Sequence, residues 1–473
     1  MISGRKNNLS ISLRFFLAGA VAVCLLFFAT GDAVSIEPVR PEKILFENGM
    51  RLIVAEMPAS DMVSVYGFVD VGSTMEGPFL GTGLSHFLEH MIFKGTLTRK
   101  PGDIPDEIQS LGGVINASTG LDYTIYTITV PAVSFSKGLD ILADMLMNAV
   151  IDEGEFDREK EVVLSELKMY KDSPDRYLSE MTFSNVYRVH PYKVPIIGYE
   201  PLLRSLTAQQ MRQHYKKFYA PNNIVLVVAG GVKKDEVVPL ARAAFEKFER
   251  TPVSLRDFPQ EPVQKGSRFY SEGYPTPLTR MSLAYRGVNV FHDDMAALDA
   301  LAMVLGQGAS SRLYRELVQR QSLVQSVSAS NFTPVGDGVF EIEVSFMDVP
   351  LDRVREEVLK QVRAIQRSGI SKEELLKAKK AVWKDYWQRQ ETSSSLAHDL
   401  AVSEGLFGDS SFSLRYVKAF DRLTVKEIQQ AARRYLVDES LTVTALTPQT
   451  QEPSGPGPDS LNFDKDAVDA VRL

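Results

Sequence analysis

The strongest constraint on the fold is an internal repeat, because one pattern occurs twice at a fixed spacing. Residues 206–230 (LTAQQMRQHYKKFYAPNNIVLVVAG) align without gaps on residues 423–447 (LTVKEIQQAARRYLVDESLTVTALT), an offset of 217 residues. Each copy predicts a threonine-capped helix, a short turn and a β-branched strand. A looser match of residues 62–73 with residues 281–290 predicts a buried strand further upstream in each copy. The repeat therefore predicts two similar domains.

These domains are expected to be α+β. Their predicted bounds are residues 40–248 and 266–448, and the Pro- and charge-rich residues 249–265 are expected to form an exposed linker. Strands and helices are mixed in each copy, which predicts a sheet covered by helices on one face. Residues 449–473, rich in Pro, Gly and Asp, are expected to form a flexible tail.

The N-terminus has the pattern of an export signal. Basic residues precede an uninterrupted apolar run from Phe15 to Phe28, and small residues follow it. This pattern predicts a signal peptide at residues 1–33 and a periplasmic protein. The alternative is an uncleaved anchor through residues 15–30, with the rest of the chain facing the periplasm. Cys24, the only cysteine, lies inside this segment, so the exported protein would contain no disulfide.

The composition narrows the partners. With 44% hydrophobic and 24% charged residues, the chain has the balance of a globular protein. Its net charge is −7, and no basic stripe is present, which argues against nucleic acid as a partner. A mildly acidic surface favours neutral or basic polypeptides.

The pentad His86-Phe87-Leu88-Glu89-His90 carries the strongest chemical signal. On a helix its two histidines and Glu89 share one face. Two imidazoles spaced i, i+4 suit a tetrahedral zinc ion, and the carboxylate can take a proton from a metal-bound water. The order is the inverse of the commoner H-E-x-x-H motif. The glycines of Gly81-Thr82-Gly83 are expected to start this helix and Gly95 to end it.

Only the first copy carries this motif. The corresponding region of the second copy, residues 306–317, reads GQGASSRLYREL and contains no histidine. One domain is therefore expected to be catalytic and the other supportive. The remaining four histidines show no second metal spacing and are expected to be surface or capping groups: His190, His214, His292 and His398.

Two histidines are too few, because a catalytic zinc site usually has three protein ligands and a water. The helical segment 153–172 offers Glu159 and Glu166, which lie two turns apart on one face. Spacing alone does not choose between them. Three apolar residues are expected to seat this helix against the core: Val162, Val163 and Leu167.

Several motifs together resemble the pitrilysin/insulinase family of inverted-zincin metallopeptidases, in particular its two-domain bacterial members related to mitochondrial processing peptidase. The motifs are GTGLSHFLEHMIFKGT at 81–96, LGGVINASTGLDYTIYT at 111–127, the helix at 153–172 and HPYKVPIIGYE at 190–200. The resemblance implies mainly antiparallel sheets and two domains arranged as a half-clamshell.

The resemblance also assigns roles to residues of this chain. It implies that His86, His90 and Glu166 bind Zn²⁺ and that Glu89 is the general base. It implies that Glu159 supports the site from behind the ligands. The strand INAST is implied to be a sheet edge on which an extended substrate pairs. The backbone near two of its residues is implied to bind the substrate: Asn116 and Ala117.

One part of the family pattern is missing. Active single-chain relatives carry, in the second domain, an Arg followed seven residues later by a Tyr that grip the substrate. Val318 and Gln325 stand at these positions, with Arg320 two residues out of place. Either a diverged loop uses Arg315 or Arg320 instead, or a paralogous partner subunit supplies the pair. Such two-domain members generally dimerise, as homodimers or heterodimers.

The sequence thus predicts an exported zinc metalloendopeptidase that cleaves peptides or unfolded polypeptides in a closed chamber, as the metal-bearing subunit of a heterodimer. The alternative is a non-catalytic peptide-binding or assembly subunit on the same fold, which the missing Arg/Tyr pair favours and the complete set of metal ligands opposes. A coenzyme-maturation peptidase would use the same chemistry.

Overall fold

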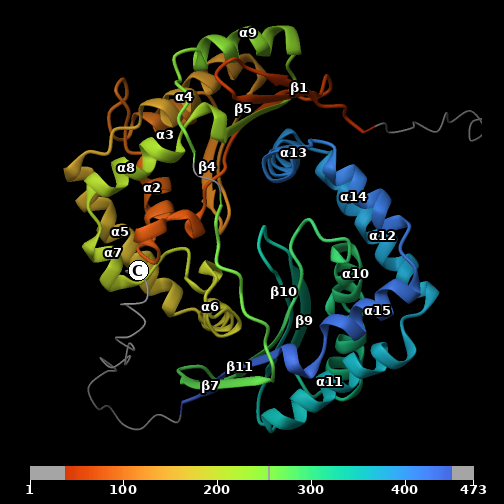
Figure 1. The fold of residues 1–473 in the computed structure, drawn as a ribbon. Helices are drawn as coiled ribbons and strands as arrows, with labels where there is room; N and C mark the ends of the chain where they lie inside the picture. The colour runs from red at the N-terminus through yellow and green to blue at the C-terminus, as the bar shows by residue number, and fades with distance from the viewer. Residues whose placement is uncertain (1–37, 254–255, 450–473) are drawn as a thin grey trace, which may run out of the picture. The chain divides into compact units, whose positions relative to one another are not determined.

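The computed structural model describes residues 38–253 and 256–449 (Figure 1). The signal peptide predicted at residues 1–33, the alternative anchor at 15–30 and the tail beyond residue 449 lie outside the described residues. Among the described helices, none combines the length and apolarity needed to cross a membrane. Both copies of the repeat belong to one compact unit that begins at Arg40.

The first copy forms a six-stranded sheet with the order β1-β2-β6-β3-β5-β4. Every neighbouring pair is antiparallel except β2 and β6. The strands are β1 (Glu42–Leu45), β2 (Arg51–Glu56), β3 (Met62–Val69), β4 (Val114–Thr119), β5 (Thr124–Pro131) and β6 (Ile224–Gly230). Strand β4 ends the row, so one of its edges has no neighbouring strand in this sheet.

The second copy repeats this topology with five strands in the order β7-β11-β8-β10-β9. Only β7 and β11 are parallel. The strands are β7 (Arg268–Tyr274), β8 (Thr279–Arg286), β9 (Ser326–Phe332), β10 (Val339–Phe346) and β11 (Leu441–Pro448). The α+β class and the two homologous, mainly antiparallel domains are therefore confirmed.

The helices also follow the repeat. In the first copy they are α2 (Leu84–Ile92), α3 (Asp103–Ser110), α4 (Phe135–Asn148), α5 (Glu153–Lys171), α6 (Pro174–Val186), α7 (Glu200–Ser205), α8 (Ala208–Phe218) and α9 (Lys234–Phe245). In the second they are α10 (Met295–Gly306), α11 (Leu351–Ser368), α12 (Lys372–Arg389), α13 (Ser393–Phe407), α14 (Phe412–Asp421) and α15 (Val425–Tyr435). The predicted threonine caps are present, because Thr207 and Thr424 each accept the backbone N–H three residues later.

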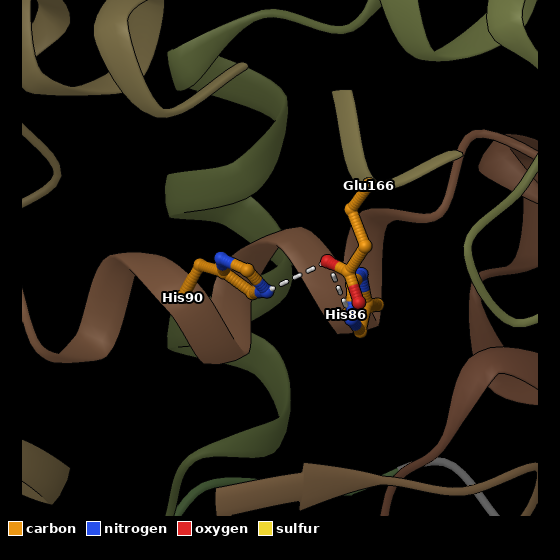
Figure 2. Close-up of side chains that lie close together, drawn as sticks. All are labelled: His86, His90 and Glu166. Carbon is orange, nitrogen blue, oxygen red and sulfur yellow. Dashed lines mark ion pairs between the residues drawn. The ribbon is translucent and has the colours of Figure 1, made fainter. Parts of the chain in front are cut away.

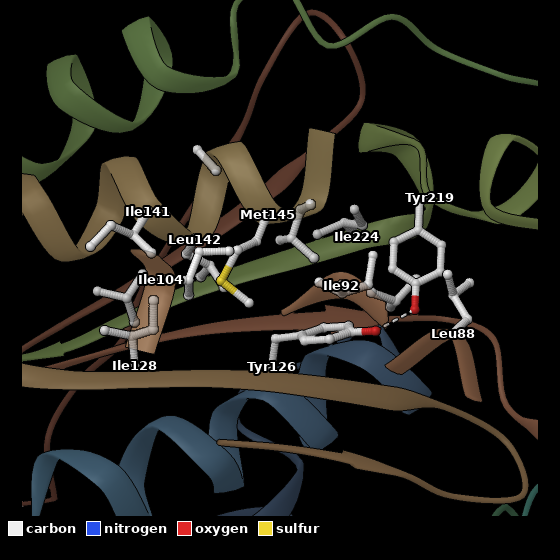
Figure 3. Close-up of a cluster of buried hydrophobic side chains, with 14 of the residues drawn as sticks. Leu88, Ile92, Ile104, Tyr126, Ile128, Ile141, Leu142, Met145, Tyr219 and Ile224 are labelled. Carbon is white, nitrogen blue, oxygen red and sulfur yellow. Dashed lines mark hydrogen bonds between the residues drawn. The ribbon is translucent and has the colours of Figure 1, made fainter. Parts of the chain in front are cut away.

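The first core fixes the helix that carries the pentad (Figure 3). Leu88 and Ile92 of α2 are fully buried among side chains of α4 and β5. In the same cluster the hydroxyl groups of Tyr126 and Tyr219 form a hydrogen bond of 2.6 Å. Because the apolar face of α2 is held in this core, the opposite face is free to present the polar residues of the pentad.

Each sheet is covered on one face by helices of its own domain, as expected, but its other face carries a helix from the other domain. On the first sheet, the Ser64 and Tyr66 side chains of β3 form hydrogen bonds of 2.9 and 2.8 Å with Ser393 and Ser394 of α13. On the second sheet, Leu178 of α6 packs in one buried cluster with strand residues of β7 and β11. The two equivalent helices α6 and α13 are thus exchanged between the domains.

The predicted linker contains no helix or strand in its described residues, 249–253 and 256–265. The two hydrophobic cores lie on either side of it, the first spanning residues 46–245 and the second residues 281–445. The exact domain bounds stay predictions.

Candidate metal centre

The pentad lies on α2, which begins where the glycine turn predicted it. The residue before the helix, Gly83, has a φ of +69°, and a Cβ atom there would lie 2.2 Å from the carbonyl oxygen of Ile197, so only glycine fits. Glu76, which the sequence analysis missed, lies beneath the first turn. Its Oε1 accepts the backbone N–H of Ser85 at 2.8 Å and satisfies a donor that the helix leaves free.

The structure brings the two histidines and Glu166 together (Figure 2). Glu166 Oε2 lies 3.7 Å from His86 Nε2 and 3.5 Å from His90 Nε2. All three donor atoms lie within 4.8 Å of one another, and no other group of three metal-ligating side chains meets this criterion among the described residues. The imidazoles come from α2 and the carboxylate from α5, which packs against it.

This cluster fits a zinc ion. Two ligands about 2.1 Å from a tetrahedral ion are separated by roughly 3.4 Å, close to the two distances between Glu166 and the histidines. Two imidazole nitrogens and one carboxylate oxygen leave the fourth position for water, as in catalytic zinc sites. The donor set therefore has the number, chemistry and spacing that a catalytic zinc ion requires.

Glu159 lies behind His90 rather than beside Glu166. Its Oε1 is 2.9 Å from His90 Nδ1, and its Oε2 is 2.6 Å from Lys94 Nζ. Burial alone would raise the pKa of Glu159, but the bonds to His90 and Lys94 outweigh it and leave the pKa lowered. A carboxylate in this place orients the imidazole that would hold the metal.

The two imidazoles have different environments. Burial and the neighbouring His90 lower the pKa of His86 to about 4, so His86 is neutral at neutral pH, the form that binds metals. Burial also acts to lower the pKa of His90, but the hydrogen bond to Glu159 and the surrounding carboxylates outweigh it, so this pKa is raised. The Nδ1 atom of His86 is buried and has no hydrogen-bond partner among the described residues.

Glu89 is a buried carboxylate on the helix that carries the two histidines. It lies on the same face of α2 as the histidines and is 8% exposed. Burial raises its pKa, and the Thr119 hydroxyl group, which donates a hydrogen bond of 2.6 Å to Oε2, opposes that shift. Thr119 is the last residue of β4 and was not singled out from the sequence.

The residues implied to bind substrate lie on the edge strand β4. The Gly120 N–H donates to the Tyr123 carbonyl oxygen at 2.8 Å, which sets the alternation of the β4–β5 hairpin. By this alternation the backbone of Ala117 faces away from β5, toward the edge. Its N–H donates to the Asn116 side-chain oxygen at 2.9 Å. The role of Asn116 and Ala117 in substrate binding stays a prediction.

A cavity of about 710 Å³ lies next to Tyr170 of α5. Tyr170, one helical turn after Glu166, donates its hydroxyl hydrogen to Glu166 Oε1 at 2.7 Å and also lines the cavity. Aromatic side chains from both domains contribute to the wall: Tyr123, Tyr170, Phe183, Tyr192, Phe332, Phe407 and Phe412. The i, i+4 spacing of Glu166 and Tyr170 was the signal that could have identified Tyr170.

The residues at the two positions of the missing Arg/Tyr pair make their contacts within the second domain. Val318 packs against the second core, and the Gln325 N–H donates to the Ser345 carbonyl oxygen at 2.8 Å. Arg320 is highly exposed and lies 3.2 Å from Glu316. Among the described residues, none of these three side chains forms a hydrogen bond or ion pair with His86, His90 or Glu166. These positions therefore contribute no side chain to the metal cluster.

Two expectations about single residues are wrong. Val163 and Leu167 are buried as expected, but Val162 is 51% exposed. Val162 precedes Glu166 by four residues, so it lies further round α5 from Val163 and Leu167 than Glu166 does. His214 is neither a surface nor a capping group, since it is 5% exposed and packs against Phe218.

Comparisons with known proteins match most of the chain. A family model described as insulinase (peptidase family M16) matches residues 51–200, and one described as peptidase M16 inactive domain matches residues 205–382. An uncharacterized zinc protease of Rickettsia felis is 30% identical over 401 residues, which cover 85% of this chain and 95% of the relative.

More distant relatives extend the match. A probable mitochondrial-processing peptidase subunit beta of Arabidopsis thaliana is 24% identical over 411 residues, 85% of this chain and 77% of the relative. The crystal structure of a protease from Helicobacter pylori superposes with a TM-score of 0.81 at 27% identity, covering 87% of this chain and all of that one.

Proposed function

The chain belongs to the insulinase family, peptidase family M16, and we propose that it is a zinc-dependent endopeptidase acting on peptides or unfolded polypeptides. The observation that carries the proposal is the convergence of His86, His90 and Glu166 from two helices at the spacing of zinc ligands. The zinc proteases among its relatives support the choice of metal.

In this proposal His86, His90 and Glu166 hold the zinc ion. When bound, zinc lowers the pKa of a coordinated water and polarises the carbonyl group to be cleaved. Glu89 takes the proton from the attacking water and passes it to the leaving amine, which requires a carboxylate on the same side of the cluster. Thr119 holds that carboxylate in place.

The open edge of β4 supplies the substrate's orientation. An extended peptide that adds to β4 pairs through its main chain, which makes recognition largely independent of sequence. Thr119, at the end of this strand, reaches Glu89, so a peptide on the edge passes beside the proposed base. Only an unfolded segment can adopt this extended pairing, which is why peptides or unfolded polypeptides are the proposed substrates.

The missing Arg/Tyr pair supports a partner subunit. With Val318 and Gln325 at the two positions, the chain would be the metal-bearing subunit of a heterodimer, and the paralogue would supply the pair. A homodimer is the alternative assembly. The N-terminal pattern supports export to the periplasm or anchoring that faces it. Purified alone, the chain should cleave unfolded peptides slowly, and adding a paralogue that has the pair should restore the rate.

Zinc content and turnover test the proposal together. Elemental analysis of the purified chain should find about one zinc per chain, and peptide cleavage should stop on chelation and return with zinc. A chain that binds peptides, lacks zinc and cleaves nothing even with its paralogue would instead be the non-catalytic subunit, which the match to a domain described as inactive favours.

A further inference from the structure

Lys94 extends the polar face of α2 by one turn. It follows His90 by four residues, as His90 follows His86, so the three positions line the same side of the helix. Lys94 lies just past the C-terminal end of α2, where a cation is favoured by the helix dipole. Its Nζ lies 2.6 Å from Glu159 Oε2.

The acidic residues of α5 contact successive residues along one side of α2 and just past its end. On α5, Glu166 meets His86 and His90, whereas Glu159, two turns earlier, meets His90 and Lys94. Glu159 is therefore held through both oxygens, one by an imidazole and one by an ammonium group. Its side chain is 8% exposed and that of Lys94 is 33% exposed.

We propose that Lys94 is a positioning residue for the zinc site, acting on His90 through Glu159. The proposal rests on the proposed zinc site. A glutamate has three side-chain torsions, and one hydrogen bond to an imidazole fixes only part of that freedom. The second contact holds Oε1 facing His90 Nδ1, which keeps the ring turned with Nε2 toward Glu166.

The difference between the two histidines strengthens this inference. The Nδ1 atom of His86 has no hydrogen-bond partner among the described residues, so no hydrogen bond at that atom fixes the rotation of the ring. Of the two rings, only that of His90 has a hydrogen-bond partner at Nδ1 among the described residues, and this partner, Glu159, also contacts Lys94. The loss of Lys94 should thus reduce the pre-organisation of the better-anchored ligand.

The competing explanation is that the Lys94–Glu159 pair only stabilises the fold. A partly exposed ion pair contributes little to stability, typically about 0–1 kcal/mol. The two explanations differ in what they affect, because a purely structural pair would change the stability of the metal-free protein and leave the zinc affinity of the folded chain unchanged.

The experiment is a zinc competition titration of the full chain against a chelating dye, with thermal unfolding of the metal-free protein as a second measurement. Lys94→Met keeps the length of the side chain and removes the charge. Loss of a direct outer partner typically weakens metal binding about 10- to 100-fold, so removal of this more remote group should raise the zinc Kd roughly 3- to 10-fold. Lys94→Arg should recover most of the affinity.

Lys137→Met is the matched control, because Lys137 forms an ion pair of 3.0 Å with Glu107 that involves no residue of the metal cluster. It should leave the zinc Kd unchanged. An unchanged or tighter Kd in Lys94→Met, or a shift equal to that of the control, would overturn the inference. Failure of the wild-type chain to bind zinc would instead reject the proposed function, so the two failures are distinguishable.

Discussion

The two domains share one topology, yet among the described residues only the first has the cluster of His86, His90 and Glu166. Strand for strand, β2-β6-β3-β5-β4 corresponds to β7-β11-β8-β10-β9. Helices α5 and α12 begin at Glu153 and Lys372, so Glu159 and Glu166 correspond to Ala378 and Asp385. The second domain has its own buried core without any of the ligands. The comparison shows that the core of this fold does not require the cluster of His86, His90 and Glu166.

The exchanged helices α6 and α13 make equivalent contacts with the two sheets through different side chains. The sheet registers equate Phe68 of β3 with Ala284 of β8, and the helix starts equate Gly405 of α13 with Val186 of α6. In the first crossing a large strand residue meets glycine, and in the second a small strand residue packs in one cluster with valine. The combined side-chain volume is similar in the two contacts, although the larger residue lies on the strand in the first contact and on the helix in the second.

The largest expected effect is a loss of turnover that distinguishes the proposed base from the metal ligands of the first domain. Glu89→Gln should lower kcat about 100- to 10,000-fold, because the amide cannot accept the proton. The zinc content should stay at the wild-type level, since Glu89 is not in the ligand cluster. Turnover of an unfolded peptide by the active preparation, alone or with its paralogue, measures the first effect and elemental analysis the second. A fully active variant would reject Glu89 as the base.

The next effect tests whether α5 and α12 differ in function as they differ in sequence. Glu166→Gln removes an anionic ligand and should weaken zinc binding by at least about 100-fold, the upper range for the loss of an outer partner. Asp385→Asn changes the equivalent position of the second domain and should leave the zinc Kd unchanged. Equal losses in both variants would mean that the metal is not held by the first domain alone.

These differences explain what could be predicted from sequence. The repeat, the pentad helix and the shared helix face of Glu159 and Glu166 are visible as patterns in the sequence. The structure shows all three. Spacing alone did not choose between Glu159 and Glu166 as the ligand; the family resemblance implied Glu166, and the packing of α5 on α2 brings Glu166 close to both histidines. The loose match of residues 62–73 with residues 281–290 located β3 and β8 but did not give their register, in which the sheets equate Val65 with Met281.

Long-range packing accounts for the other omissions. The exchange of α6 and α13 could not be foreseen, since it depends on where each helix docks after the chain has left its own domain. Thr119 reaches Glu89 across 30 residues of sequence, and Glu76 caps Ser85 across nine. Such contacts are set by tertiary structure, whereas Tyr170 and Lys94 lie at helical spacing from ligands and could have been found.

A smaller effect is expected from the residue that holds the base. Thr119→Val removes a hydrogen bond to a charged group, which is typically worth about 1.5–3 kcal/mol, so kcat/KM should fall by roughly 10- to 100-fold. Losing this donor should also raise the pKa of Glu89 further, which moves the acidic limb of the pH profile to higher pH. Ser118→Ala, on the exposed opposite side of β4, is the control and should change neither quantity.

The volume argument can be tested by introducing the side chains of the second contact into the first. A Cβ atom at Gly405 would lie 2.4 Å from the Phe68 ring, so Gly405→Val should cost about 1–3 kcal/mol of unfolding free energy. In a Phe68→Ala background, which imitates Ala284 and Val186, the same substitution should cost little or stabilise. Denaturant titration of the four proteins measures this coupling. Additive effects would contradict the volume argument.

The smallest effect concerns a buried histidine that only the first domain has, since His214 of α8 corresponds to Ala431 of α15. Burial lowers the pKa of His214 to about 3, below its usual value near 6.5. The folded state therefore disfavours the charged form, so its stabilising contribution is complete above pH 6.5 and is lost as the pH falls toward 3. Each pH unit in this window should cost up to about 1.4 kcal/mol. His214→Ala should lower stability by a constant amount but reduce this pH dependence, as measured by denaturant titration between pH 7 and pH 5. An unchanged slope would show that protonation of other groups governs the acid stability of the first domain.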